Sequence, residues 1–143
     1  MQQPIVISGA GILGCYISCA LSLQGIDSIV LEKKDDEVED SVRTITLNPF
    51  SKNLLDKIGI ENDYSMINKM EVKDFDGTGK IVFKSSEIGM DHLAYVSDFA
   101  TLLMAIRKKA SEKILYKEEI ITVSYTHLRA HETPEHRVWR ILG

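Results

Sequence analysis

Cysteine is almost absent from this 143-residue chain, and its two copies stand four residues apart, at Cys15 and Cys19. Such a pair cannot build the disulfide framework of a small secreted domain. A zinc site needs further ligands, whereas a helix that packs on a sheet favours small apolar residues, so we interpret both cysteines as packing residues. The near absence of cysteine indicates an intracellular, cytoplasmic protein.

A net basic charge is also missing, because 17 Lys and Arg stand against 21 Asp and Glu, for a formal net charge of −4. Proteins that bind nucleic acids carry a basic face, so no nucleic-acid partner is expected. With 44% hydrophobic and 27% charged residues, the composition is that of a folded domain and not of a disordered chain. The length corresponds to one domain, or to a piece of a larger protein.

Charged residues are absent between Pro4 and Ile26, over a length sufficient to cross a bilayer. Glycines, serines and Gln24 interrupt this run, and no basic segment precedes it, which argues against both a transmembrane helix and a signal peptide. A strand, a glycine turn and a buried helix account for the same apolarity. We therefore expect no membrane-spanning segment.

The glycine turn has the spacing of a dinucleotide-binding fingerprint. The β-branched run over 4–8 predicts a buried strand, and a helix is expected over 12–24, with Gly25 ending it. The residues of the G-x-G-x-x-G motif between them are predicted to bind the cofactor: Gly9, Ala10, Gly11, Ile12, Leu13 and Gly14. In this motif the first glycine makes a tight turn, the second lets a pyrophosphate approach, and the third lets the helix pack on the strand. The phosphates would bind at the helix N-terminus.

An acidic residue follows the fingerprint at the distance that adenosine recognition requires. A second strand is predicted over 28–31, and Glu32 follows it, 18 residues after Gly14. A carboxylate at this position accepts hydrogen bonds from the ribose hydroxyls and disfavours a 2′-phosphate. Lys33 is included in the predicted cofactor site because, with Lys34, it would offset part of that repulsion. A solvated lysine pair is the simpler interpretation of both.

The chain after Glu32 departs from a plain nicotinamide-binding domain. Asn48-Pro49 provides an N-cap and a first-turn proline, which predict a helix over 49–58. Its packed face is expected to comprise Phe50, Leu54, Leu55 and Ile58, with Gly59 ending the helix. Runs over 69–75 and 80–84 flank turn residues and predict an inserted β-hairpin at about 69–84. Ser97 is expected to cap a helix over 98–111, and a third parallel strand is expected at 114–116.

The order of these segments resembles the N-terminal part of the ubiquinone-biosynthesis hydroxylases, which are flavin-dependent aromatic monooxygenases. The resemblance covers about residues 4–121. It is carried by the glycine fingerprint, Glu32, Asp40–Leu47, Leu54–Gly59, Val72–Gly77 and Leu93–Val96. It implies an α/β fold, with a Rossmann-like FAD-binding parallel sheet and an inserted hairpin. It also implies that the chain stops before the second flavin motif and most of the substrate domain.

The resemblance implies a function for the parent enzyme. FAD would be the cofactor, NAD(P)H its reductant, and O₂ the source of the oxygen that hydroxylates a phenolic, ubiquinone-precursor-like ring. Arg43 would lie near the flavin and the pyrophosphate. The family often carries another arginine at the start of the helix that is predicted here over 98–111. This chain has Asp98, Phe99 and Ala100 there instead. A peripheral membrane association of the parent enzyme is left open.

No side chain is predicted to act as a nucleophile, a catalytic base or a metal ligand, since the flavin carries the chemistry in this family. His92 has no visible partner and is expected to be a loop or core residue. An NAD-dependent dehydrogenase and a non-catalytic dinucleotide-binding fragment are alternatives. The Arg43 segment and the hairpin argue against the dehydrogenase. The absence of the second flavin motif leads us to expect that the fragment itself is inactive.

The composition changes near residue 122. The first 121 residues hold 12 Lys, whereas residues 122–143 hold none, but carry three of the four histidines and the one Trp. Val123–Thr133 resembles, residue for residue, one reading frame of a DNA adaptor that is ligated to fragments for sequencing. We therefore interpret 122–143 as a non-native tail that does not pack on the domain at 1–121. The alternative is a metal site formed by His127, His131, Glu132 and His136. Pro134 argues against it, because it interrupts the helix that would align these ligands.

Overall fold

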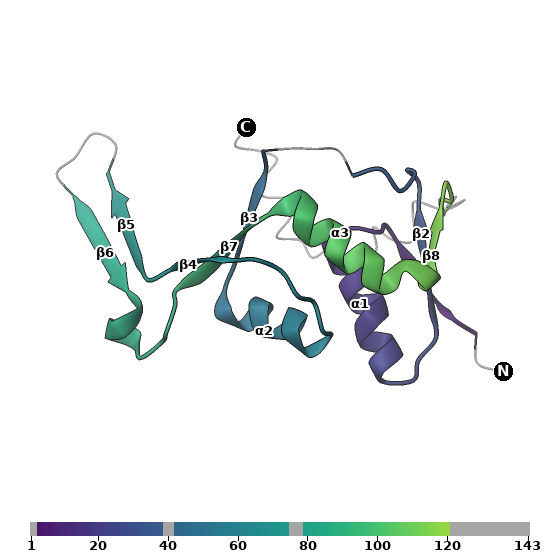
Figure 1. Cartoon of the computed structure of the whole chain (residues 1–143), viewed down its shortest axis with the longest axis horizontal. Helices are drawn as coiled ribbons and strands as arrows, with labels where there is room; N and C mark the ends of the chain where they lie inside the picture. The colour runs from purple at the N-terminus through teal and green to yellow at the C-terminus, as the bar shows by residue number, and fades with distance from the viewer. Residues whose placement is uncertain (1–2, 39–41, 75–78, 121–143) are drawn as a thin grey trace, which may run out of the picture.

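The computed structural model describes residues 3–38, 42–74 and 79–120 (Figure 1). In chain order the elements are β1 (Ile5–Ser8), α1 (Ile12–Leu23), β2 (Ser28–Glu32), β3 (Thr44–Leu47), α2 (Pro49–Lys57), β4 (Ser65–Ile67), β5 (Lys69–Lys73), β6 (Lys80–Lys84), η1 (Ser85–Ile88), β7 (Ala94–Asp98), α3 (Phe99–Ala110), η2 (Ser111–Lys113) and β8 (Ile114–Tyr116). The three parallel strands and three helices predicted from the sequence all occur, with ends that differ by at most one residue. The predicted tail at 122–143 lies outside the described residues.

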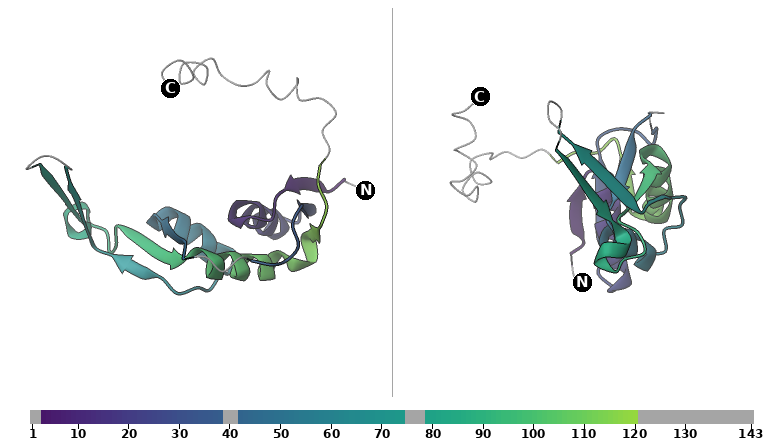
Figure 2. Two further views of the ribbon diagram at one scale, coloured as in Figure 1. Left: turned by 90° about the horizontal axis from the view of Figure 1, so that it is seen from above. Right: turned by 90° about the vertical axis from the view of Figure 1, so that its left-hand side faces the viewer.

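A parallel sheet of order β1-β2-β8 forms one end of the molecule. Ile5 of β1 pairs with Ser28 of β2, and Val30 of β2 pairs with Ile114 of β8. The strand–turn–helix–strand unit of the fingerprint is therefore present, and the predicted α/β fold with a parallel sheet is confirmed. Helices α1 and α3 lie side by side next to this sheet (Figures 1 and 2).

A second sheet, of order β3-β7-β4, is antiparallel, and β5 and β6 form a separate two-stranded ribbon. Met70 pairs with Phe83 and Val72 with Ile81, so the predicted hairpin strands are present, although residues 75–78 between them are not described. Figure 2 shows this ribbon extending away from the helices at the end of the molecule opposite to β1. Helix α3 starts directly after β7 and leads through η2 to β8, so it joins the two larger sheets.

Helix α2 begins as its sequence predicts. The side chain of Asn48 accepts a hydrogen bond of 2.7 Å from the N–H of Ser51, and Gly59 adopts the left-handed conformation just after the helix. Leu55 and Ile58 are buried, but Phe50 is 69% exposed, so its predicted place on the packed face is wrong. At 100° per residue, Phe50 lies roughly 110° from the middle of the face that Leu55 and Ile58 share.

Helix α3 has a different cap from the predicted one. Asp98, not Ser97, is the N-cap, and its carboxylate accepts a hydrogen bond of 2.7 Å from the N–H of Thr101. Ser97 is buried in β7, where its hydroxyl accepts a bond of 2.6 Å from the side-chain amide of Asn62. The strand extends through Asp98 because that residue still pairs with Thr44 of β3. The packed stripe of α3 consists of Leu102, Leu103, Ile106 and Ala110, all of which are buried.

Both cysteines lie on the face of α1 that packs in the core, and both are free thiols. Cys15 is fully buried, and this burial raises the pKa of its thiol to about 11. One turn on, the hydroxyls of Ser18 and Ser28 lie 2.9 Å apart and join α1 to β2. The interpretation of the cysteines as packing residues therefore agrees with their environment. In the described part of the chain, no helix combines the length and the apolarity needed to cross a bilayer.

Candidate dinucleotide-binding site

The first glycine of the fingerprint makes the sharp turn that ends β1. Gly9 has φ = +95°, a conformation that a residue with a side chain rarely adopts. Its N–H donates to the carbonyl oxygen of Leu31 at 2.7 Å, so the turn is attached to the end of β2. The chain is thereby directed from the sheet into α1.

The other two glycines serve different purposes. A Cβ on Gly14 would stand 2.1 Å from the carbonyl oxygen of Gly9, so helix and turn are in contact there. A Cβ on Gly11 would meet no atom within 4 Å. Gly11 is also the N-cap of α1 and provides no side chain to bind the first amides of the helix. The turn therefore leaves open space beside the N-terminus of α1, where an anion is stabilised by exposed N–H groups and the helix dipole.

Ile12 and Leu13 form the first turn of α1. Ile12 packs against the core, whereas the side chain of Leu13 is 70% exposed. Any contribution of these two residues to phosphate binding thus comes from their backbone N–H groups, because neither side chain is polar.

Glu32, the last residue of β2, contacts the backbone of the glycine turn. Its Oε2 accepts a hydrogen bond of 2.7 Å from the N–H of Ala10, and its Oε1 accepts one of 3.1 Å from the N–H of Lys34. Burial by itself would raise the pKa of this carboxyl. The two N–H donors and the guanidinium of Arg107 outweigh burial and hold the pKa below its ordinary value. Glu32 is therefore an ionised acceptor fixed beside the glycine turn.

Arg107, on the last turns of α3, is a site residue that the sequence did not reveal. Its Nε donates to the carbonyl oxygen of Ala10 at 2.9 Å, and its Nη2 lies 3.6 Å from Oε2 of Glu32. The side chain is only 10% exposed. Because 97 residues separate it from Ala10, no local motif connects the two. Its one visible signal was that it is one of only two arginines in the first 121 residues.

Lys33 and Arg43 make their described contacts elsewhere. The ammonium of Lys33 is 2.9 Å from a carboxylate oxygen of Glu119, and both side chains are mostly exposed. This favours the interpretation of Lys33 as a solvated lysine. The guanidinium of Arg43 stacks over the ring of Phe99, 4.4 Å from its centroid, and the N–H of Phe99 donates to the Arg43 carbonyl oxygen. Arg43 is thus held at the junction of β7 and α3.

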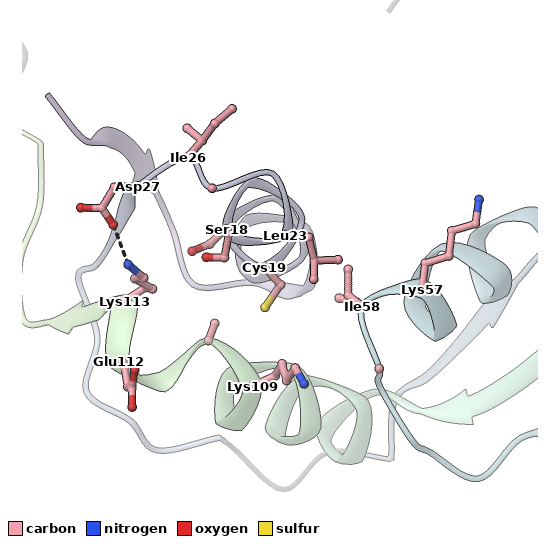
Figure 3. Close-up of a pocket in the computed structure, with 14 residues that line it drawn as sticks. Ser18, Cys19, Leu23, Ile26, Asp27, Lys57, Ile58, Lys109, Glu112 and Lys113 are labelled. Atoms are coloured by element: carbon pink, nitrogen blue, oxygen red, sulfur yellow. Dashed lines mark hydrogen bonds and ion pairs between the residues drawn. The ribbon is translucent and has the colours of Figure 1, made fainter. Parts of the chain in front are cut away.

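Two further features lie outside this site. His92 lies in the loop before β7, in line with its interpretation as a loop or core residue; its Nδ1 is 2.5 Å from the side-chain oxygen of Asn68, and its ring packs edge-on against Tyr95. A cavity of about 700 Å³ opens at the C-terminal end of α1, remote from the glycine turn (Figure 3). Asp27 and Lys113 form an ion pair at its edge, 2.5 Å apart.

A family model described as FAD binding domain matches residues 2–137. The ubiquinone biosynthesis monooxygenase COQ6, mitochondrial, of Danio rerio is 26% identical to this chain, over 86% of this chain and 29% of that protein.

Solved structures show the same fold. The p-nitrophenol 4-monooxygenase PnpA of Pseudomonas putida DLL-E4 superposes with a TM-score of 0.66 at 18% identity, over 84% of this chain and 34% of that one. HpxO of Klebsiella pneumoniae, crystallised with FAD and uric acid, superposes with a TM-score of 0.64 at 18% identity, over 84% of this chain and 32% of that one. The chain thus spans about a third of the length of the relatives it matches.

The domain boundary near residue 121 and the cellular location are not tested by these similarities. The family match extends past residue 121 into the segment interpreted as a translated adaptor, so the domain boundary at that point stays a prediction. The cytoplasmic location also stays a prediction, because the name of the Danio rerio relative places that protein in the mitochondrion.

Proposed function

Because this chain belongs to the FAD-binding domain family, whose cofactor is FAD, we propose that its glycine turn and Glu32 hold the ADP half of that cofactor. We further propose that the chain is the N-terminal part of a monooxygenase that uses NAD(P)H and O₂ to hydroxylate a phenolic, ubiquinone-precursor-like ring. The name of the Danio rerio relative supports the choice of substrate.

One observation carries the cofactor proposal. The N–H of Ala10 donates to Glu32 Oε2, and the backbone next to it, at Gly11, has free space where a side chain would stand. The turn therefore offers open backbone for a pyrophosphate at Gly11. The neighbouring residue, Ala10, contacts an ionised carboxylate that can accept hydrogen bonds from the ribose hydroxyls. The residues present fit an ADP moiety.

The roles of the chain's own residues follow from this fit. The exposed N–H groups at the start of α1 would bind the pyrophosphate, and Glu32 would orient the ribose. The proposed place of Arg43 near the flavin rests on the resemblance, because its guanidinium and its carbonyl oxygen both contact Phe99 at the start of α3. The flavin, when bound, supplies the oxygen chemistry, and the protein supplies orientation.

We propose that the 143-residue chain by itself hydroxylates no phenol. It matches about a third of the length of its relatives, and the remaining contacts that hold the flavin ring are expected from the segments it does not match. Misplacing reacting groups by about 1 Å can cost roughly a hundredfold in rate.

The test compares ligands that share different halves of FAD. Equilibrium dialysis of the full chain should show binding of FAD and ADP-ribose, and no competition by FMN, which lacks the adenosine and one of the two phosphates. Glu32→Ala should weaken both FAD and ADP-ribose by about tenfold or more, since it removes a charged acceptor. Binding that FMN displaces, or binding that Glu32→Ala leaves unchanged, would contradict the proposed site.

A separate assay addresses activity. NADH oxidation with FAD and a prenylated phenol present should not exceed the rate with free FAD alone. A protein that stays yellow through gel filtration and consumes NADH when the phenol is added would contradict the proposed inactivity of the chain, while leaving the ADP site intact.

A further inference from the structure

Arg107 is a mostly buried cation whose hydrogen bond and ion pair are made with the glycine turn and its acidic partner. From α3 it donates to the carbonyl oxygen of Ala10 and faces Oε2 of Glu32, while the N–H of the same Ala10 donates to that same Oε2. Ala10, Glu32 and Arg107 therefore form a closed arrangement, in which each residue contacts the other two. Ala10 lies between Gly9 and Gly11, so this arrangement includes the fingerprint itself.

Stability alone does not account for this arginine. Its Nη1 is buried and has no hydrogen-bond partner among the residues that the structure describes. A buried guanidinium that lacks a bond costs free energy, and apolar side chains of similar size often replace buried ion pairs without loss of stability.

We propose that Arg107 is a positioning residue for the dinucleotide: it holds the glycine turn and the Glu32 carboxylate as one preformed unit that receives the ADP half of the cofactor. This inference rests on the proposed function of the turn. Arg107 is assigned a positioning role and not that of a cofactor ligand, because its guanidinium already contacts the Ala10 carbonyl oxygen and Glu32 and lies 5.8 Å from the centroid of the Tyr116 ring.

The charged and titratable groups around Glu32 make this role measurable by pH. Arg107 faces it from α3, Lys34 from its own loop, Cys15 from α1 and Tyr116 from β8. The pKa of Cys15 is raised to about 11 and that of Tyr116 to about 12, mainly by burial, so neither titrates between pH 5 and pH 8. Removal of the Arg107 cation would raise the pKa of Glu32, which would then lose its charge at a higher pH than in the wild-type chain.

The experiment measures ADP-ribose binding by calorimetry in the full chain, at pH 7.5 and pH 5. ADP-ribose is chosen because its pyrophosphate diester keeps one charge state over this range. Arg107→Met should lower the affinity by about tenfold or more at pH 7.5, since a charge-assisted contact that fixes Glu32 is lost. Its affinity should fall further at pH 5, whereas the wild-type affinity should change by less than about twofold.

Two variants make the result specific. Lys108→Met removes a cation from the next, exposed position of α3 and should bind ADP-ribose like the wild type at both pH values. Arg107→Lys keeps the charge but lacks the planar fork that reaches Ala10 and Glu32 together, so it should bind more weakly without the additional loss at pH 5. If Arg107→Met does not fold, this lysine variant decides the question.

The outcomes separate the two proposals. A wild-type chain that binds neither FAD nor ADP-ribose overturns the proposed function, and the role of Arg107 with it. A wild-type chain that binds both, with Arg107 variants that bind equally well at both pH values, overturns the role of Arg107 alone. An affinity loss in Arg107→Met that matches its unfolded fraction, measured by circular dichroism, also overturns it.

Discussion

A Cβ atom on Gly14 would lie 2.1 Å from the carbonyl oxygen of Gly9, closer than any side-chain carbon approaches backbone. Gly14→Ala should therefore displace α1 from the turn and lower the free energy of unfolding by about 2 kcal/mol, the usual cost of overpacking. Urea denaturation measures this loss. The matched control is Gly11→Ala, whose Cβ meets no atom within 4 Å.

Gly11→Ala is expected to keep the stability of the chain and to weaken its binding of ADP-ribose. Its unfolding free energy should change by less than about 1 kcal/mol, the scale on which helix N-cap exchanges act. Its affinity for ADP-ribose should fall, because the added methyl group occupies the space in which the pyrophosphate would stand. Equal stability losses in the two variants would mean that the turn is not built as described.

The depressed pKa of Glu32 predicts a pH dependence of stability. A carboxyl whose pKa is lower in the folded than in the unfolded chain stabilises the fold above the unfolded value, and this stabilisation is lost as the pH falls through the folded value. Glu32→Gln should thus unfold more easily than the wild type at pH 7, by about 2 kcal/mol for the charge-assisted hydrogen bonds it weakens. The difference should shrink below pH 4.5. A difference that is constant with pH would contradict the ionised state.

The buried thiols predict chemical inertness. With its pKa raised to about 11 by burial, Cys15 is a neutral thiol at pH 8, and Cys19 has a raised pKa for the same cause. Neither should react with Ellman's reagent in the native chain within minutes, and two thiols should react once urea unfolds it. Rapid native reaction at either cysteine would show that α1 does not pack as described.

The interpretation of residues 122–143 as translated adaptor predicts that they contribute nothing to folding. A chain that ends at Ile121 should melt at the same temperature as the full chain, or higher, in differential scanning calorimetry. A substantial loss of thermal stability, or one zinc ion retained per chain after dialysis, would instead favour an evolved segment with a metal site.

Local spacing was enough to predict the parts of the site that are close in sequence. The strand, the glycine turn, the helix and Glu32 follow one another within 29 residues, from Pro4 to Glu32, and each has its own sequence signal. Arg107 has no such signal, because only the packing of α3 on α1 brings it to Ala10. The cap of α3 was misplaced by one residue, since both Ser97 and Asp98 are good caps and the pairing of Asp98 with Thr44 decides between them.

Helix α3 also couples two regions that are far apart in the molecule. It is a rod of 12 residues, about 18 Å long, with its first residue bonded to Arg43 at the antiparallel sheet and Arg107 bonded to the glycine turn near its other end. The length of α3 therefore fixes the spacing between the antiparallel sheet and the glycine turn.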